Sequence, residues 1–227
     1  MSKTVKDEIL DKLKAAPQKE PPPRPVMPPL KELALNKEEM VEKLVETLTL
    51  VGCDVHRVRD SEEALETLTE IARAEGLTKV LVSEDDVVSP LDLPGWGKKS
   101  NIEVFTAKDC RDREDFKRVA FEEAQAGITG VDFAVAESGT ICLIHDERQP
   151  RLVSLAPIRH IAVVPVDRVR PVYESVTDEL FAEGGKAPSH LTFISGPSMT
   201  ADIQATPFRG MHGPKTVTVI LVGRASS

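Results

Sequence analysis

Residues 191–222 read LTFISGPSMTADIQATPFRGMHGPKTVTVILV, and the two ends of this stretch decide the fold. Leu191–Ile194 and Thr216–Val222 are short, rich in β-branched residues and bounded by turn-forming residues, which predicts two strands. The run 217–222, like 161–164 earlier in the chain, is almost entirely apolar. Such runs are typical of strands buried on both faces, as in an α/β sheet covered by helices.

Helices and strands are predicted to alternate through the rest of the chain, with a hairpin-rich section in the middle. The predicted helices run from an Asn36 cap to about Gly52, from a Ser61 cap to Gly76, from Arg113 to Ala126, and from Val172 to Glu183. The predicted strands are 54–58, 79–82, 102–106, 133–136, 140–144, 151–155 and 160–164. Trp96 is assigned to the loop between strands 79–82 and 102–106. This order predicts the α/β class.

The first 29 residues differ in composition from the rest. Residues 1–16 have a weak amphipathic helical pattern. A block of prolines follows, at Pro17, Pro21, Pro22, Pro23, Pro25, Pro28 and Pro29, and such a segment favours an extended spacer. We therefore expect an N-terminal helix and Pro-rich arm over residues 1–29, and an α/β domain over residues 30–227.

Composition excludes several classes of function. The net charge of −8 and the aromatic content of 4% argue against a nucleic-acid partner, which needs a basic surface or stacking platforms. The sequence lacks an apolar leader pattern and a long uncharged apolar run, so we expect a cytoplasmic protein without a membrane span. Cys53, Cys110 and Cys142 are widely spaced, which argues against a disulfide framework, an iron–sulfur site or a zinc site on this chain.

The loop between the two strands of residues 191–222 is the first candidate site. It combines glycines at 196 and 213 with polar side chains: Ser198, Thr200, Asp202, His212 and Lys215. We expect Ser198 or Thr200 to cap a helix whose free N–H groups bind a carboxylate or phosphate, with positive charge added by Lys215. A connecting loop without a ligand would also contain Gly and Pro, and this alternative stays open.

The second candidate site is the turn at residues 137–140, which follows an apolar strand. Glu137 could serve there as a nucleophile or general base, while Ser138, Gly139 and Thr140 let a ligand approach the backbone. The alternative is that Glu137 and Thr140 only bind the turn's own amides. Asp132 is expected to cap the element that follows it rather than to act chemically.

Other motifs of catalysis are missing from the sequence. His145, His160 and His212 lie on separate segments without metal-ligand spacing, so no metal site is predicted, and His160 is expected to be a hydrogen-bonded core residue. The chain also lacks the phosphate-binding loop of nucleotide hydrolases, the GxGxxG fingerprint and the GxSxG pattern. Binding of phosphate is compatible with the sequence, whereas nucleotide hydrolysis is not.

Three motifs resemble one known family. GITGVDFAVAESGTI at 127–141, PIRHIAVVPVDRVRP at 157–171, and ISGPSMTADIQ with GMHGP at 194–214 resemble the LutC/YkgG-type proteins of the lactate utilisation (LUD) domain family. The resemblance covers about residue 36 to the end. It implies a Rossmann-like open sheet related to the sugar-phosphate isomerase and CoA-transferase folds. Met199 occupies a position where the family commonly has a basic residue.

The resemblance also implies a function. In the family's three-protein system, which oxidises L-lactate to pyruvate, iron–sulfur clusters are carried by partner subunits, and this chain would be an accessory subunit that binds a small anion. An alternative is a stand-alone isomerase-like or CoA-transferase-like enzyme that uses Glu137. A third possibility is a ligand-sensing or scaffold module without chemistry.

Overall fold

The computed structural model describes residues 5–15, 33–182, 188–201 and 207–223. The chain divides into two compact units, residues 1–32 and 33–227. Within the first unit, helix α1 spans Val5–Ala15 and exposes Val5, Ile9, Leu10 and Leu13. The Pro-rich segment lies outside the described residues, and the expected domain boundary near residue 30 stays a prediction.

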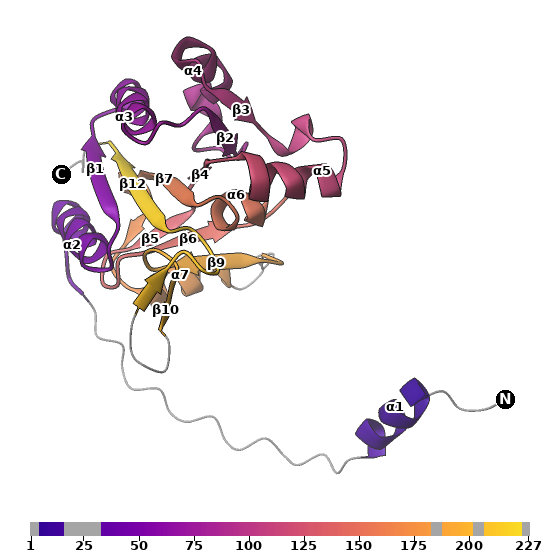
Figure 1. The fold of residues 1–227 in the computed structure, drawn as a ribbon. Helices are drawn as coiled ribbons and strands as arrows, with labels where there is room; N and C mark the ends of the chain where they lie inside the picture. The colour runs from indigo at the N-terminus through magenta and orange to yellow at the C-terminus, as the bar shows by residue number, and fades with distance from the viewer. Residues whose placement is uncertain (1–4, 16–32, 183–187, 202–206, 224–227) are drawn as a thin grey trace. The chain divides into compact units, whose positions relative to one another are not determined.

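The second unit is built on a six-stranded parallel sheet with the order β1-β12-β7-β4-β2-β3 (Figure 1). Its strands are β1 (Asp54–Val58), β2 (Lys79–Val82), β3 (Glu103–Phe105), β4 (Ala126–Gly130), β7 (Arg159–Pro165) and β12 (Thr216–Val222). The predicted α/β class is confirmed, as is the burial of residues 161–164, Val217 and 219–221.

A second sheet lies in the same unit and has the order β8-β5-β6-β9. It consists of β5 (Phe133–Val135), β6 (Thr140–Ile144), β8 (Val169–Arg170) and β9 (Leu191–Ile194). The predicted hairpin in the middle of the chain is its β5–β6 pair, and β9 adds to β6 in antiparallel register. A separate short hairpin pairs β10 (Met199–Ala201) with β11 (Pro207–Arg209).

The helices cover both faces of the parallel sheet, apart from α7, which packs on β5 and β8 of the second sheet. They are α2 (Lys37–Leu50), α3 (Ser61–Ala74), α4 (Leu93–Ser100), α5 (Arg113–Arg118, continued by a π-helical turn at Val119–Glu123), α6 (Arg151–Leu155) and α7 (Tyr173–Leu180). Single-turn helices occur at Ser89–Leu91, Ala107–Asp109 and Val166–Arg168. None of the described helices is long and apolar enough to cross a membrane.

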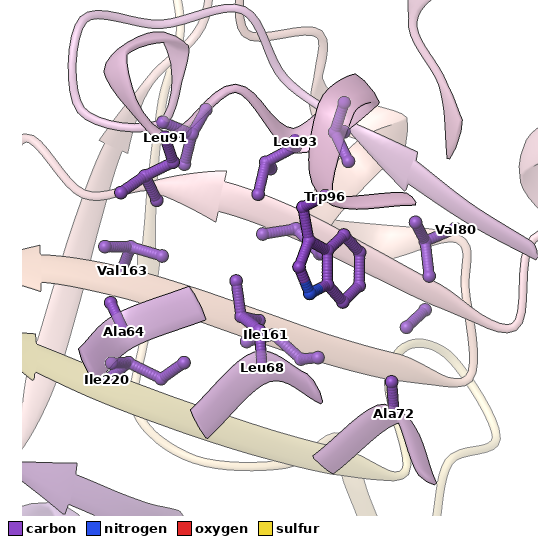
Figure 2. Close-up of a cluster of buried hydrophobic side chains, with 14 of the residues drawn as sticks. Ala64, Leu68, Ala72, Val80, Leu91, Leu93, Trp96, Ile161, Val163 and Ile220 are labelled. Carbon is purple, nitrogen blue, oxygen red and sulfur yellow. The ribbon is translucent and has the colours of Figure 1, made fainter. Parts of the chain in front are cut away.

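Side chains on successive strand positions divide between two cores, because they point to opposite faces of the sheet. Figure 2 shows one core, in which Leu68 and other residues of α3 pack on Ile161 and Ile220 beside Trp96 of α4. The Trp96 indole N–H donates to Thr69 Oγ1 at 2.9 Å. The other core joins α2 and the second sheet to the opposite face through residues such as Ala162.

Helix α2 begins as the sequence predicts, whereas α3 does not. The Asn36 side chain accepts from Glu39 N at 3.0 Å, and Glu39 reciprocates at 2.8 Å in a capping box. The predicted Ser61 cap of α3 is wrong: the cap is Asp60, whose Oδ1 accepts from Glu62 N and Glu63 N at 3.1 Å each. Asp60 lies one residue earlier, which leaves its carboxylate within reach of the free N–H groups of the first turn.

Three other predictions of secondary structure, between residues 96 and 155, are wrong. Residues 151–155 form helix α6 rather than a strand, and Trp96 lies in helix α4 rather than in a loop. The helix predicted from Arg113 to Ala126 ends at Glu123, and residues 126–130 form the buried strand β4. Short apolar segments carry too little periodicity to separate helix from strand, and tertiary packing decides between them.

Candidate functional site

The two candidate segments of the sequence lie next to each other. Strands β6 and β9 pair with Ile141 opposite Ile194, which places Thr140 beside Ser195. The Thr140 and Ser195 hydroxyls are 2.7 Å apart, and the Ser138 hydroxyl is 2.8 Å from that of Thr140. A row of three hydroxyls therefore links the turn at residues 137–140 to the loop that follows β9.

Both segments pack against the C-terminal end of α2, and each contact is made at a glycine. Gly139 has a φ of +62°, and a β-carbon there would lie 2.5 Å from the backbone carbon of Thr47. Gly196 has a φ of +87°, and its β-carbon would lie 2.3 Å from Val51 O. The Thr47 hydroxyl completes the contact by donating to Ala136 O at 2.8 Å. These glycines are explained by close backbone packing, without any ligand.

A cavity of about 200 Å³ lies beside the loop that follows β9. Its polar lining consists of Ser154, Thr192, Ser195, Gly196, Ser198, His212 and Gly213. Three of the hydroxyls already have partners: Thr192 bonds His145 Nε2 at 2.7 Å, Ser154 bonds Arg151 O, and Ser195 bonds Thr140. The side chains of Ser198 and His212 have no hydrogen-bond partner among the described residues, so these two groups are free to contact a ligand.

The structure does not bring every predicted residue to this cavity. Glu137 is exposed; its backbone N–H donates to Pro171 O at 3.1 Å, and its carboxylate forms no hydrogen bond or ion pair within the described part of the chain. Glu137, Ser138, Gly139 and Thr140 do not line the cavity, and neither do Thr200 of β10 and the exposed Lys215. Asp202 lies outside the described residues. Two wider hollows, of about 580 and 740 Å³, contain none of the predicted site residues.

The described residues that follow Ser198 form a strand and not the expected helix, which is a correction to the predicted anion site. Residues 199–201 form β10, and Thr200 pairs with Phe208 across the hairpin. Neither Ser198 nor Thr200 therefore caps a helix. Ser198 N instead donates to Pro214 O at 2.9 Å, and Ser198 O accepts from Gly210 N at 2.9 Å. Strand pairing with 207–209 outweighs the local capping preference of Ser and Thr.

Asp85, Asp132 and Arg168 lie where β2, β4 and β7 end, and of these three only Asp132 is singled out by the sequence. Ligand sites of parallel sheets lie at this carboxyl edge, near the point where the strand order reverses. The buried Asp85 accepts from Gly130 N at 2.9 Å and from the Ser83 hydroxyl at 2.5 Å, which fastens β2 to β4. Carboxylates directly after an apolar run, as in residues 79–86, were the available signal.

Asp132 is the titratable member of this group. Burial raises its pKa to about 6, against the opposing effects of a hydrogen bond from Ile144 N and the charge of Arg168. The Ile144 N–H donates to Asp132 Oδ2 at 2.7 Å, so the carboxylate holds the end of β6 and not, as expected, the element that directly follows Asp132. Arg168 donates to Val131 O at 3.1 Å and lies 4.0 Å from Asp132 Oδ1. A carboxyl with this pKa exchanges protons near neutral pH.

We expect Asp132→Asn to stabilise the protein by about 2 kcal/mol at pH 8. The folded-state pKa is raised, so ionisation of Asp132 costs stability as the pH rises from about 4 to 6, and the amide removes that cost while it still accepts from Ile144 N. Urea denaturation at pH 8 and pH 4 measures the difference. The gain in stability should disappear at pH 4. The control variant Glu147→Gln, at an exposed carboxylate, should show no gain. An equal gain at both pH values would contradict the raised pKa of Asp132.

His145, His160, Cys53 and Cys142 occupy buried positions inside the fold. His160 is fully buried and its Nε2 lies 2.9 Å from the Thr129 hydroxyl, which confirms the predicted core role. His145 uses both ring nitrogens, one toward Gln149 O at 3.1 Å and one toward Thr192. Burial raises the pKa of Cys53 to about 11 and that of Cys142 to about 12. Within the described ranges, no three His, Cys, Asp or Glu side chains cluster as a metal site.

Comparison with known proteins adds a family match. The profile of the LUD domain matches residues 41–222. The chain is 32% identical over 192 residues to a protein named lactate utilization protein C from Halalkalibacterium halodurans, covering 82% of this chain and 80% of that protein. It is 30% identical over 191 residues to lactate utilization protein C 1 of Bacillus mycoides, with 83% and 81% covered.

Among solved structures, a DUF162 family protein from Deinococcus radiodurans is similar, with a TM-score of 0.58 and 25% identity. The match covers 83% of this chain and 99% of that one. The similarity in three dimensions thus extends over most of the second unit, in agreement with the extent of the sequence match.

Proposed function

Since this chain belongs to the LUD domain family, we propose that it is an accessory subunit of a cytoplasmic, iron–sulfur-dependent system that oxidises L-lactate to pyruvate. The names of its relatives, lactate utilization protein C, support the metabolic role. The proposal assigns the iron–sulfur clusters to partner subunits. It also treats residues 1–29 as an arm and residues 30–227 as the LUD-type domain.

The chemistry of the cysteines supports this division of labour. Iron–sulfur clusters are held by thiolates, commonly four of them. This chain has three cysteines, all free, and burial favours the protonated thiol at Cys53 and Cys142 because it raises the pKa of both. Electron transfer through a cluster is therefore a task for another subunit.

The single observation that carries a binding role is the 200 Å³ cavity with the free side chains of Ser198 and His212. We propose that it binds a small carboxylate or phosphate. A cavity of this size is smaller than the usual pocket for a drug-sized ligand, which matches a metabolite of a few carbon atoms. The Ser198 hydroxyl and the His212 imidazole would donate hydrogen bonds to the anion, and Gly196 and Gly213 also line the cavity.

We expect Ser198→Ala combined with His212→Ala to weaken binding of L-lactate, pyruvate or inorganic phosphate by at least about 10-fold, because hydrogen bonds to charged groups contribute about 1.5–3 kcal/mol each. Isothermal titration calorimetry on the purified chain measures this. His190→Ala is the matched control, since His190 is exposed and does not line the cavity. Equal affinities for the double variant and wild type would contradict the proposed site.

The same variants test the metabolic role in cells. Deletion of the gene should abolish growth on L-lactate and leave growth on pyruvate intact, and wild type or the His190→Ala variant should restore it. The double variant should restore growth poorly. Normal growth of the deletion strain on L-lactate would overturn the accessory-subunit proposal, whatever the binding assay shows.

A second candidate function rests on Glu137, whose carboxylate is exposed and forms no hydrogen bond or ion pair with a described residue. The proposal is a stand-alone enzyme related to the sugar-phosphate isomerases or CoA transferases, with Glu137 as base or nucleophile. The purified chain would then convert a pentose phosphate or acetyl-CoA, and Glu137→Gln would abolish turnover. Equal inactivity of wild type and variant removes this candidate.

A further inference from the structure

Thr192 lines the 200 Å³ cavity that is proposed to bind an anion. Its partner in the β6–β9 pairing is Leu143, and directly paired residues point to the same face of a sheet. Leu143 and Ile194 belong to the core that joins the second sheet to the parallel sheet, whereas Phe193 packs in the small core with α7. The Thr192 side chain therefore points toward the parallel sheet, where Val217 of β12 also lines the cavity.

The proton of the Thr192 hydroxyl is bound to His145. The His145 Nδ1 lies 3.1 Å from Gln149 O, and a carbonyl oxygen only accepts, so Nδ1 carries a ring proton. Burial lowers the pKa of His145, which keeps the ring neutral at pH 7. A neutral ring has no second proton, so Nε2 accepts from the Thr192 hydroxyl at 2.7 Å. Only the oxygen lone pairs of Thr192 are left for a ligand.

Ser154 has the same polarity as Thr192. The hydroxyl of this buried residue donates to Arg151 O at 3.1 Å within α6, and Ser154 lines the same cavity. A hydroxyl whose proton is bound inside the protein can accept a hydrogen bond from a ligand but cannot donate one. The cavity therefore has two accepting oxygens besides the free side chains of Ser198 and His212.

These accepting oxygens carry no charge, which limits the kind of donor that fits them. Among the described residues that line the cavity, none is Asp or Glu. A ligand ammonium would lose its water there without gaining a counter-ion, which is costly. A hydroxyl is neutral and can donate one hydrogen bond, so it is the donor that this lining accepts at the lowest cost.

We propose that Thr192, held in its accepting state by the positioning residue His145, makes the cavity selective for 2-hydroxy carboxylates over their 2-keto counterparts. The inference rests on the proposed function, in which Ser198 and His212 bind the carboxylate. A hydroxyl on the neighbouring carbon then donates to Thr192 Oγ1 or Ser154 Oγ. A keto oxygen at this place faces the same lone pairs and leaves them without a hydrogen bond, and sites that bind a ligand hydroxyl reject analogues that lack it.

Isothermal titration calorimetry on the purified wild-type chain with L-lactate, pyruvate and L-alanine tests this selectivity. The three probes share a carboxylate and differ at the second carbon, which carries a hydroxyl, a keto group or an ammonium. We expect L-lactate to bind about 10-fold more tightly than either of the other two, or better. Equal or tighter binding of pyruvate would overturn the inference.

Substitutions at Thr192 and His145 separate selectivity from general effects on the site. Thr192→Val removes the hydroxyl at nearly constant volume and should remove most of the preference for L-lactate, whereas Thr192→Ser keeps the hydroxyl and should keep the preference. His145→Ala frees the Thr192 proton for a keto oxygen, so the affinity for pyruvate should rise relative to that for L-lactate. The control Thr67→Val, which removes a hydroxyl of α3 outside the cavity, should change neither affinity.

The quantity compared is the ratio of the two affinities, because a loosened site weakens both ligands by the same factor. If wild type binds none of the probes, the proposed anion site is wrong, and the selectivity with it. If wild type binds L-lactate and pyruvate equally, only the selectivity is wrong. If wild type prefers L-lactate and Thr192→Val keeps the ratio, Thr192 does not select the ligand. Should Thr192→Val fail to fold, an unchanged ratio in His145→Ala overturns the proposal on its own.

Discussion

Gly139→Ala is expected to lower the free energy of unfolding by about 2–5 kcal/mol, because two costs add at this position. The φ of +62° is in the left-handed region, which costs a residue with a β-carbon about 1–2 kcal/mol. The new methyl group would also lie 2.5–2.7 Å from backbone atoms of Thr47 and Leu48, and neither chain segment can rotate away as a side chain does. Overpacking of this kind adds about 1–3 kcal/mol.

Gly76→Ala separates these two costs. Gly76 has nearly the same φ, +61°, but no atom lies within 4 Å of a β-carbon built there. Its substitution should therefore cost only the backbone contribution, about 1 kcal/mol. Urea denaturation followed by circular dichroism gives both values. Equal losses for the two variants would show that the turn at 137–140 does not pack on α2 as described.

The second large effect is a loss of stability in acid that depends on His160. Burial lowers the pKa of His160 to about 4, and the unfolded chain takes up this proton near pH 6.5. The unfolded state is therefore favoured as the pH falls from 6.5 to 4, and the loss reaches about 3 kcal/mol, with no further contribution below pH 4. Burial also lowers the pKa of His145, which acts in the same direction.

Denaturation of wild type and His160→Gln between pH 7 and pH 4 measures this effect. The contact of His160 Nε2 with the Thr129 hydroxyl changes in the variant, so the quantity compared is the slope of the unfolding free energy with pH. Wild type should lose about 3 kcal/mol more than the variant across this range. Asp132 contributes with the opposite sign in both proteins and cancels in the difference. Parallel curves would contradict the buried, neutral state of His160.

Much of the fold could be predicted from local pattern. The bounds of strands 54–58, 79–82, 191–194 and 216–222 agree with the structure, because each is a short apolar or β-branched run between turn residues. The Asn36 cap was also predictable, since a capping box depends on residues only three positions apart.

The errors occur where packing overrides local preference. Strand β4 contains two glycines, which normally weaken a strand, yet both are required by neighbours. A β-carbon at Gly127 would lie 1.7 Å from Val153 O of α6, and one at Gly130 would lie 2.1 Å from the Asp85 carboxylate. Neither contact leaves a signal in the sequence around residue 127, so the sequence predicts no strand at 127–130 and places Ala126 at the end of the preceding helix.

The candidate site was predictable in part. The motifs at 137–140 and 194–214 identify the family, and the polar residues 196, 198, 212 and 213 do line one cavity. The sequence did not show that Glu137 and Lys215 lie outside it, or that Asp132 is a half-buried acid. The position of the turn at 137–140 depends on the β6–β9 pairing, which joins residues about 50 positions apart. The pKa of Asp132 depends on its burial in the folded chain.

Residue type and spacing along the chain were enough for the α/β class, the family and most of the strands, because apolar periodicity and turn residues act over a few positions. Only the tertiary structure decided which polar groups share a cavity and which carboxyl has a raised pKa. These properties depend on desolvation and on contacts between distant segments, and a linear pattern does not encode them.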